Sequence, residues 1–265
     1  MTSDRVRGSR VMDVDEYERI AAAETGHWWY RNARSLAADL LEPWLPHCGL
    51  VLDAGCGPGA TGAWLTQYST VVGVDVAHEA LSLLQKRHAD VVPVQADLTR
   101  LPFVDESFGD VIVVTVLYAV PDDRAALREL RRVLRPGGVL LTIEPAFPAL
   151  RRSHDRVVGG VRRYRRAGLV SVMGQAGFTV RRSTYACSFL APPAGILALA
   201  ERVRPPKHVA GGGSDLQKPS LDTMFARLAA IERRWLSRGH DVPVGTSLAI
   251  VATRDDATRS SVSHT

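Results

Sequence analysis

A glycine-rich turn after a short apolar run is the feature that most constrains how this chain can fold. Leu50 to Leu52 predict a buried strand, Asp53 follows it, and four glycines lie between residues 55 and 62. A strand that turns through glycines into a helix lets the backbone approach a ligand closely, because no Cβ is in the way. The start of that helix offers unpaired N–H donors to polar ligand groups. We therefore predict a ligand site at this turn.

Apolar runs and helical stripes alternate after the turn. The predicted strands are residues 70–75, 91–96, 111–116 and 139–143, and the predicted helices are 61–68, 77–88 and 122–134. This alternation predicts an α/β fold with a doubly wound, mostly parallel, Rossmann-like sheet that has helices on both faces. The ligand site of such a sheet lies at the carboxyl ends of its strands.

Acidic side chains stand where several of these strands end. They are Asp53, Asp75, Asp97 and Glu144. One acid at such a position is ordinary, whereas four of them indicate acceptor groups gathered around one ligand. The simpler interpretation is that the acids cap the helices that follow.

The motif at the turn admits two families. Gly57 to Gly62 fit the pattern G-x-G-x-x-G with Asp75 at about the right distance, which would permit an NAD-type oxidoreductase. Taken with what precedes it, however, the stretch Asp53-Ala54-Gly55-Cys56-Gly57-Pro58-Gly59 resembles the first motif of class I S-adenosylmethionine-dependent methyltransferases. The resemblance continues in order through residues 73–75, 96–97, 108–111 and 127–138. It is closest to the small-molecule branch that includes ubiquinone- and menaquinone-biosynthesis methyltransferases.

The resemblance implies roles for the residues of the turn. Gly55, Gly57 and Gly59 would let the backbone approach the methionine moiety and the ribose of S-adenosyl-L-methionine, and Cys56 between them would also belong to the cofactor site. Asp53 would lie under the amino-acid part of this cofactor. The product of transfer would be S-adenosyl-L-homocysteine.

The resemblance also implies roles at the ends of the next strands. Asp75 would accept both ribose hydroxyls, which needs an ionised bidentate acceptor. Asp97 would accept from the adenine amino group, and Val76 and Leu98 would flank the ring. Thr115 would lie near the methionine group.

Three consecutive aromatic residues precede this domain and follow neither helical nor strand periodicity. The run His27 to Arg31 is interpreted either as an apolar staple that docks an N-terminal arm on the core or as a lid over a ligand. It is similar to a subset of bacterial family members in which the arm covers the cofactor. That similarity implies that Trp29 and Tyr30 face the sulfonium cation and that Arg31 or Arg34 pairs with the carboxylate.

Methyl transfer by direct displacement needs mainly alignment, and it needs a base only if the acceptor loses a proton. His154 is the first candidate as base or substrate ligand, because it follows a strand's carboxyl end and has a suitable unperturbed pKa. The alternative is a surface histidine. Tyr164 and His27 are weaker candidates. No metal-binding pattern is present in the sequence, and the three cysteines indicate no disulfide framework.

Residues 151–182 contain nine arginines and one acid. Three interpretations stay open for this cluster: a solvated face, a pocket for an anionic acceptor, or a membrane-facing patch. The apolar helix predicted at 191–203 and the amphipathic helix after it either rest on a membrane or form a cap that builds the acceptor pocket, and we prefer the cap. Nucleic acid binding is not expected, because basic and aromatic residues do not interleave.

The domain organisation follows from these patterns. We predict a flexible tail at 1–12, a helical arm or lid at 13–46, a methyltransferase domain at 47–254 with a helical insertion at 190–240, and a second flexible tail at 255–265. No apolar run approaches the roughly 18 residues of a membrane span, so we expect a cytoplasmic protein. We expect it to be a monomer or a homodimer. The expected partner is a small-molecule acceptor, anionic or lipid-like, such as a natural product or glycan precursor. A family member that binds the cofactor without transferring methyl, or that catalyses a cyclisation, is the alternative.

Overall fold

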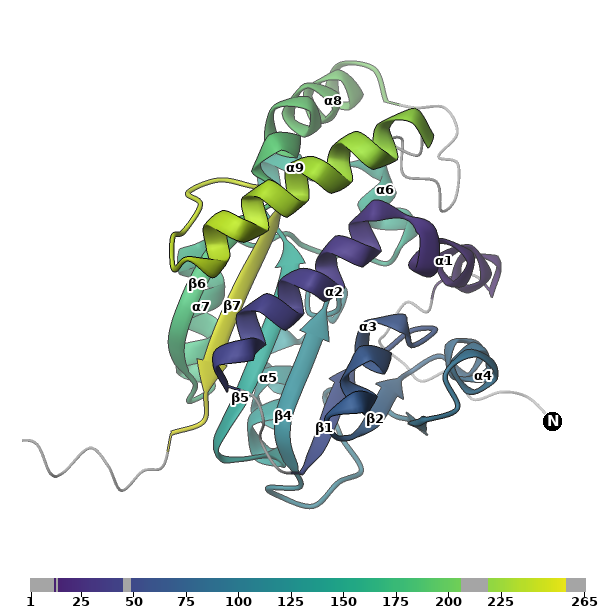
Figure 1. Cartoon of the computed structure of the whole chain (residues 1–265), viewed down its shortest axis with the longest axis vertical. Helices are drawn as coiled ribbons and strands as arrows, with labels where there is room; N and C mark the ends of the chain where they lie inside the picture. The colour runs from purple at the N-terminus through teal and green to yellow at the C-terminus, as the bar shows by residue number, and fades with distance from the viewer. Residues whose placement is uncertain (1–11, 13, 45–48, 206–218, 256–265) are drawn as a thin grey trace, which may run out of the picture.

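The computed structural model describes residues 12, 14–44, 49–205 and 219–255. Most of the two predicted tails therefore lies outside the described residues, as does the middle of the predicted insertion. In the described part of the chain, helices enclose one seven-stranded sheet (Figure 1).

The sheet has the predicted doubly wound topology. Its strands lie in the order β3-β2-β1-β4-β5-β7-β6. The first five strands in this order are parallel, and β7 pairs antiparallel with both β5 and β6. The strands are β1 (Leu50–Ala54), β2 (Thr70–Asp75), β3 (Val91–Gln95), β4 (Phe108–Val114), β5 (Leu134–Pro145), β6 (Thr179–Ala186) and β7 (Ser247–Thr253).

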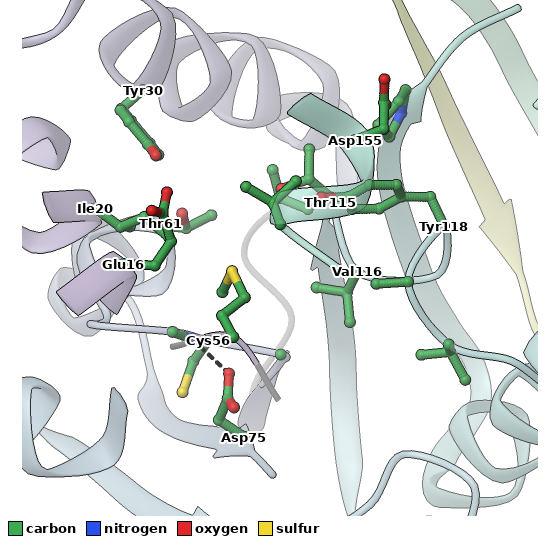
Figure 2. A pocket seen from close by; sticks show the side chains of 18 of the residues that line it. Glu16, Ile20, Tyr30, Cys56, Thr61, Asp75, Thr115, Val116, Tyr118 and Asp155 are labelled. Atoms are coloured by element: carbon green, nitrogen blue, oxygen red, sulfur yellow. Dashed lines mark hydrogen bonds between the residues drawn. The ribbon is translucent and has the colours of Figure 1, made fainter. Parts of the chain in front are cut away.

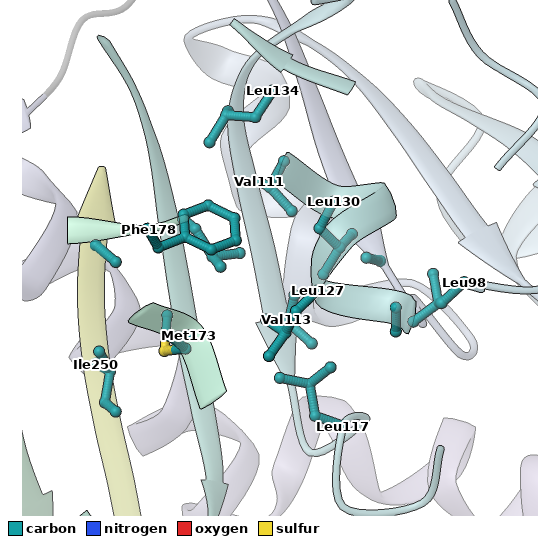
Figure 3. Close-up of a cluster of buried hydrophobic side chains, with 14 of the residues drawn as sticks. Leu98, Val111, Val113, Leu117, Leu127, Leu130, Leu134, Met173, Phe178 and Ile250 are labelled. Carbon is teal, nitrogen blue, oxygen red and sulfur yellow. The ribbon is translucent and has the colours of Figure 1, made fainter. Parts of the chain in front are cut away.

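Both faces of the sheet are buried, which explains the near-continuous apolar strands. Alternate residues of β4 point to opposite faces: Val111 and Val113 belong to one hydrophobic cluster, Ile112 and Val114 to another. The first cluster is covered by α5 (Asp123–Val133) and α7 (Arg166–Gln175), and Figure 3 shows several of its side chains. The second cluster contains residues of α2 (Trp28–Leu41), α4 (His78–Arg87) and α9 (Pro219–Ser237).

The aromatic run that broke the predicted periodicity lies at the start of helix α2. Consecutive residues of a helix point about 100° apart, so three adjacent aromatics diverge. All three aromatic residues line the cavity described below, and Trp28, which is only 2% exposed, also packs on Phe189 and Phe225. The run therefore contributes both to packing and to the cavity, which a single apolar stripe does not reveal.

Several short elements complete the fold. The helix predicted at 61–68 is a short α3 (Ala60–Ala63) followed by a 3₁₀ turn, η2 (Trp64–Gln67). Between β5 and α7 the chain forms η3 (Pro148–Leu150) and α6 (Ser153–Val157). The remaining elements are α1 (Val14–Gly26), η1 (Glu42–Trp44), η4 (Ser188–Leu190) and α8 (Ala191–Val203).

The N-terminal helices and the insertion before β7 are both present as predicted. Helix α1 contacts α3 and α4, so it lies over the glycine turn. Tyr17 of α1 packs on Ala77 and Ala80. Helix α9 packs along α2, and both run across the same side of the sheet (Figure 1). The elements that cover the carboxyl ends of the strands thus come from both ends of the chain.

Candidate functional site

A cavity of about 620 Å³ opens at the carboxyl ends of the parallel strands. Its size lies within the 300–1,000 Å³ typical of small-molecule sites. Helix α1 and the glycine turn form one wall, and the segments after β4 and β5 form the opposite wall (Figure 2). The sequence-predicted residues that line it are Gly55, Cys56, Gly57, Asp75, Val76, Asp97, Leu98, Thr115, Trp29, Tyr30, His27 and His154. The buried Nε2 atom of His27 has no hydrogen-bond partner among the described residues.

Two glycines of the turn are required for different reasons. Gly57 has a φ of +54°, and a Cβ added there would meet no atom within 4 Å, because the position faces open space beside the cavity. Gly59 has a φ of +100° and does not line the cavity. A Cβ at Gly59 would lie 2.0 Å from Leu84 Cδ1, so this glycine allows α4 to pack against the turn.

Asp75 joins the turn to the end of β2. Its Oδ2 accepts from the Gly57 N–H at 3.0 Å, and its Oδ1 accepts from the Ala77 N–H at 2.9 Å (Figure 2). Burial raises the pKa of this carboxyl, and the backbone donors of Ala77, Gly57 and Val76 oppose that rise. The side chain is therefore fixed with both oxygens oriented, as a bidentate acceptor must be.

The ends of β3 and β4 supply the next part of the wall. Asp97 Oδ1 accepts from the N–H and the hydroxyl of Thr99, both at 2.8 Å, which orders the turn after β3. Thr115 has a φ of +56°, an uncommon conformation for a β-branched residue. Its N–H donates to the Ile143 carbonyl at 2.7 Å, so β5 holds this strained residue at the cavity.

Asp53 does not line the cavity but lies directly behind the glycine turn. It is fully buried, and a Cβ on Gly62 would come within 2.3 Å of its Oδ2. Burial, and then the nearby Glu24 and Asp75, raise the pKa of Asp53 to about 8. The Oδ2 atom has no hydrogen-bond partner among the described residues.

Glu24 of α1 is a cavity residue that the sequence reasoning missed. It is buried at the cavity wall and accepts from the Ala60 N–H at the start of α3. Burial raises its pKa to about 7, although Arg87 and Arg34 oppose the rise, and its Oε2 lacks a partner in the described part of the chain. The only available signal was an acid next to the aromatic run.

The two arginines expected to pair with the cofactor carboxylate, Arg31 and Arg34, do not line the cavity, whereas Arg19 of α1 does. Arg31 pairs with Asp222 of α9 at 2.9 Å, and Arg34 donates to the Glu24 backbone carbonyl at 2.8 Å. Both guanidinium groups that were expected to pair with the cofactor carboxylate therefore bind other protein groups. Both arginines instead hold the arm in position.

The far end of the cavity combines aromatic and apolar residues with one histidine. Tyr118, Leu150, Val158, Leu190 and Ala194 line it together with His154 (Figure 2 shows Tyr118). The His154 Nδ1 atom is buried and has no partner among the described residues. It is therefore the group in this region best placed to meet a polar atom of a bound molecule.

Two arginines reach the same region, and both are paired with acids. Arg163 makes a two-pronged pair with the buried Asp155, at 2.8 and 3.1 Å. Arg152 pairs with Glu201 of α8 at 2.5 Å. The region is thus close to neutral in charge.

Tyr164 and Glu144 lie near the site without lining it. The Tyr164 hydroxyl donates to Asp123 Oδ2 at 2.6 Å and is buried, so it is occupied away from the cavity. Glu144 accepts from the N–H groups of residues 116, 117 and 118, and burial raises its pKa to about 7. Its role is to hold the loop after β4, so it does not belong to the ring of ligand acceptors that the four-acid pattern indicated.

The arginine cluster mostly serves as internal bracing. Arg162 donates to the carbonyls of Val120 and Pro121, both at 2.6 Å, and Arg182 donates to those of Leu236 and His240. Arg166 lies 5.1 Å from the ring centre of Tyr185. These contacts, which none of the three interpretations anticipated, bind the segments after β5 to their neighbours.

Comparison with known proteins defines the class of this site. Residues 52–142 match the family described as a methyltransferase domain. Methyltransferase GfsG of Streptomyces halstedii is 38% identical over 98 residues, which are 34% of this chain and 35% of that protein. The demethylmenaquinone methyltransferase of Roseiflexus sp. (strain RS-1) is 36% identical over 133 residues, which are 47% of this chain and 55% of that protein. The chain thus spans between about a third and just over half of these relatives.

Solved structures agree on the fold. A chain of a Haloferax volcanii complex that contains the Trm112 methyltransferase activator superposes with a TM-score of 0.63 at 18% identity, covering 94% of this chain and all of that one. The cyclase SpnF superposes with a TM-score of 0.55 at 19% identity, covering 84% of this chain and 81% of that one.

The matched methyltransferase domain covers about a third of the chain, and with the methyltransferase relatives it supports the resemblance to class I S-adenosylmethionine-dependent methyltransferases of the small-molecule branch. The solved structures confirm the predicted α/β fold, and the matched methyltransferase domain supports the predicted cofactor, S-adenosylmethionine. The residues present fit this cofactor: Gly57 leaves open space at the turn, and Glu24 presents a partnerless oxygen at the cavity wall.

Proposed function

We propose that this protein transfers a methyl group from S-adenosylmethionine to a small, mainly apolar acceptor. The observation that carries the proposal is the cavity itself. One end is bounded by the glycine turn and the oriented carboxylate of Asp75, and the other end is mainly apolar and includes His154, whose Nδ1 has no partner among the described residues.

The first end supports cofactor binding through residues of this chain. Asp75 would hold the ribose hydroxyls, Asp97 the adenine amino group, and Val76 and Leu98 the faces of the ring. Glu24, with a carboxyl oxygen left without a partner, would face the ammonium or sulfonium charge. When bound, S-adenosylmethionine supplies the activated methyl group, so the protein's part is to align the acceptor and exclude water.

The second end favours an apolar acceptor over an anionic one. Arg152 and Arg163, the arginines that reach it, are already paired with Glu201 and Asp155. An anionic acceptor would have to compete with these carboxylates. Two relatives are named for demethylmenaquinone and for phthiotriol and phenolphthiotriol dimycocerosates, and an acceptor of lipid-like character is consistent with the apolar lining.

His154 is the group we assign to the acceptor's proton. Its imidazole lines the cavity, and the buried Nδ1 has no partner in the described residues. A neutral imidazole nitrogen in this position would accept a proton from a hydroxyl or amine acceptor as the methyl bond forms. A carbon acceptor would use the same nitrogen after transfer.

Calorimetric titration of the full chain with S-adenosylmethionine, S-adenosylhomocysteine and NAD tests the first step. We expect binding of the first two and none of NAD. The second step is release of S-adenosylhomocysteine in the presence of panels of apolar phenols, quinols and lipid-like alcohols, with anionic analogues as the comparison. Tight cofactor binding with no release for any panel would contradict methyl transfer and favour a cyclase or a binding protein.

A further inference from the structure

Helix α8 presents an apolar stripe to solvent. Ile196 is 70% exposed, Leu199 60% and Val203 80%, and Pro192 is exposed on the same helix. Residues 192, 196, 199 and 203 follow helical spacing, so these side chains share one face. The opposite face carries the buried Ala198. An exposed apolar stripe of this length on a helix marks an interaction surface.

Helix α9 carries a second stripe with the same character. Met224, Leu228, Ile231 and Trp235 recur at helical spacing, and all four are exposed, Ile231 by 64% and Trp235 by 51%. The Trp235 ring stacks on His240 with ring centres 4.0 Å apart. The buried face of α9 is formed by residues 225, 229 and 236.

The charges on the two helices are sorted between their faces. The acids turn inward to protein partners: Glu201 pairs with Arg152, Asp222 pairs with Arg31, and Glu232 accepts from the Ser188 N–H. Among the described residues of α8 and α9, no acid is exposed. The exposed charges are the arginines Arg202, Arg227 and Arg234, and Arg204 follows α8. This surface is therefore apolar and positively charged.

The two stripes lie at the same end of the molecule. A small hydrophobic cluster joins Leu190, at the start of α8, to Phe225 and Ala229 of α9. Figure 1 shows both helices beyond the carboxyl ends of the strands, away from β2 and α4. Leu190 and Ala194 also line the cavity, so the surface borders the acceptor end of the site.

We propose that α8 and α9 form a docking surface for membranes that contain anionic phospholipids. Apolar side chains inserted at the headgroup level, an aromatic anchor and flanking arginines are the combination that interfacial helices use. The absence of exposed acids among the described residues of both helices removes the repulsion that an anionic surface would otherwise meet. Within the described ranges no helix combines the length and hydropathy of a bilayer crossing, so the proposed contact is peripheral.

Vesicle flotation of the full chain tests the proposal. We expect the protein to float with mixed phosphatidylglycerol–phosphatidylcholine vesicles, to lose most binding at high salt, and to bind pure phosphatidylcholine weakly. Val203→Glu should reduce binding about tenfold or more, since an acid at this position opposes both insertion and the anionic surface. Val104→Glu is the matched control, because Val104 is 79% exposed in a loop far from these helices in the chain.

A second readout locates the contact on α9. Tryptophan emission should shift to shorter wavelength when vesicles are added, and Trp235→Phe should remove most of that shift. Circular dichroism and cofactor titration of each variant check that it is folded. A wild-type protein that does not float, or a Val203→Glu variant that floats like Val104→Glu, overturns the proposal. Concentration-dependent dimers abolished by Val203→Glu, without flotation, would assign the surface to a second copy of this chain. The measurement needs no methyl acceptor, so its failure is separate from failure of the proposed function.

Discussion

The Asp75 carboxylate organises the cofactor end of the site because it binds two separate backbone segments. Its oxygens accept from Gly57 in the turn and from Ala77 at the start of α4. A single side chain thus fixes the turn and would recognise the ribose. An amide in its place has one acceptor oxygen, so one of these contacts must be lost.

Asp75→Asn should weaken binding of S-adenosylhomocysteine about tenfold to a hundredfold, since a hydrogen bond to a charged group contributes about 1.5–3 kcal/mol. Isothermal titration calorimetry measures the change. Asp90→Asn is the control, because Asp90 is exposed before β3 and does not line the cavity. Equal affinities for the two variants would remove Asp75 from the cofactor site.

His154→Ala should lower the turnover number by about 10²–10⁴-fold on an acceptor that loses a proton, the range for general base catalysis. Cofactor affinity should stay within about twofold, because His154 belongs to the far end of the cavity. Initial rates of S-adenosylhomocysteine release give the comparison. His78→Ala, on the exposed side of α4, should behave like the wild type. A His154→Ala enzyme with unchanged turnover would show that the acceptor needs no base here.

The site residues that could be located from sequence are those whose contacts follow from the order of strands and helices. Gly57 and Asp75 meet because parallel strands bring the end of β2 beside the turn after β1, and that pairing follows from the alternation of elements. Arg31 and Arg34 could not be placed in this way. Their partners, Asp222 and the Glu24 carbonyl, depend on how α1, α2 and α9 pack.

At the scale of elements, α9 fastens the two covers of the cavity. Asp222 accepts from the Trp28 N–H at 2.8 Å, so a residue of α9 caps the start of α2. Ten residues later, Glu232 accepts from the N–H groups of Cys187 and Ser188 at the start of η4. One helix thereby holds both the N-terminal arm and the segment that leads into α8.

Asp222→Ala should lower the free energy of unfolding by about 0.5–2 kcal/mol, the usual cost of losing a helix cap. Asp222→Asn should lose less, because its side-chain oxygen can still accept from the Trp28 N–H. Urea denaturation of both variants, followed by circular dichroism, separates the cap from the Arg31 ion pair. If the two variants are equally destabilised, the ion pair rather than the cap is what matters.

Helices and strands were predictable from sequence where each of their faces is either buried or exposed along its whole length. The inner parallel strands are near-continuously apolar because both of their faces are buried, and helices α4 and α5 have apolar stripes because each covers one face of the sheet. Helix α2 departs from such a pattern at its start, where Trp28, Trp29 and Tyr30 all line the cavity and Trp28 also packs on α9. Short elements such as α6 are held by side-chain contacts, here Asp155 with Arg163 and Ser153 with Glu201, and leave no periodicity to read.

At the scale of the whole molecule, buried carboxyls make the stability of the cofactor-free protein depend on pH. Burial raises the pKa of Asp53 to about 8 and those of Glu24 and Glu144 to about 7. A group with a raised folded-state pKa stabilises the fold fully below its unfolded pKa, and this contribution is lost as the pH rises through the folded pKa. The carboxyls of Glu129, Glu201, Asp222 and Asp255 have lowered pKa values, so their contributions are lost only in acid.

The window from pH 7 to about 8.5 isolates the buried carboxyls. Burial lowers the pKa values of His27 and His88, so their effect is to raise the free energy of unfolding as the pH rises. This rise is complete near the pKa of histidine in the unfolded chain, about 6.5. The raised pKa values of the buried cysteines and tyrosines act at higher pH. The free energy of unfolding should therefore fall across this window.

Asp53 alone should account for about 1 kcal/mol of that fall, because most of its ionisation with a pKa of about 8 occurs there. Urea unfolding of the wild type and of Asp53→Asn at both pH values measures the difference, with Asp90→Asn as a surface control. The Asp53→Asn protein should show the smaller pH dependence by this amount. A wild-type slope that Asp53→Asn leaves unchanged would mean that Asp53 is ionised behind the turn throughout. Saturating S-adenosylmethionine should reduce the wild-type fall as well, since its positive charges favour the ionised carboxyls and its affinity should rise with pH.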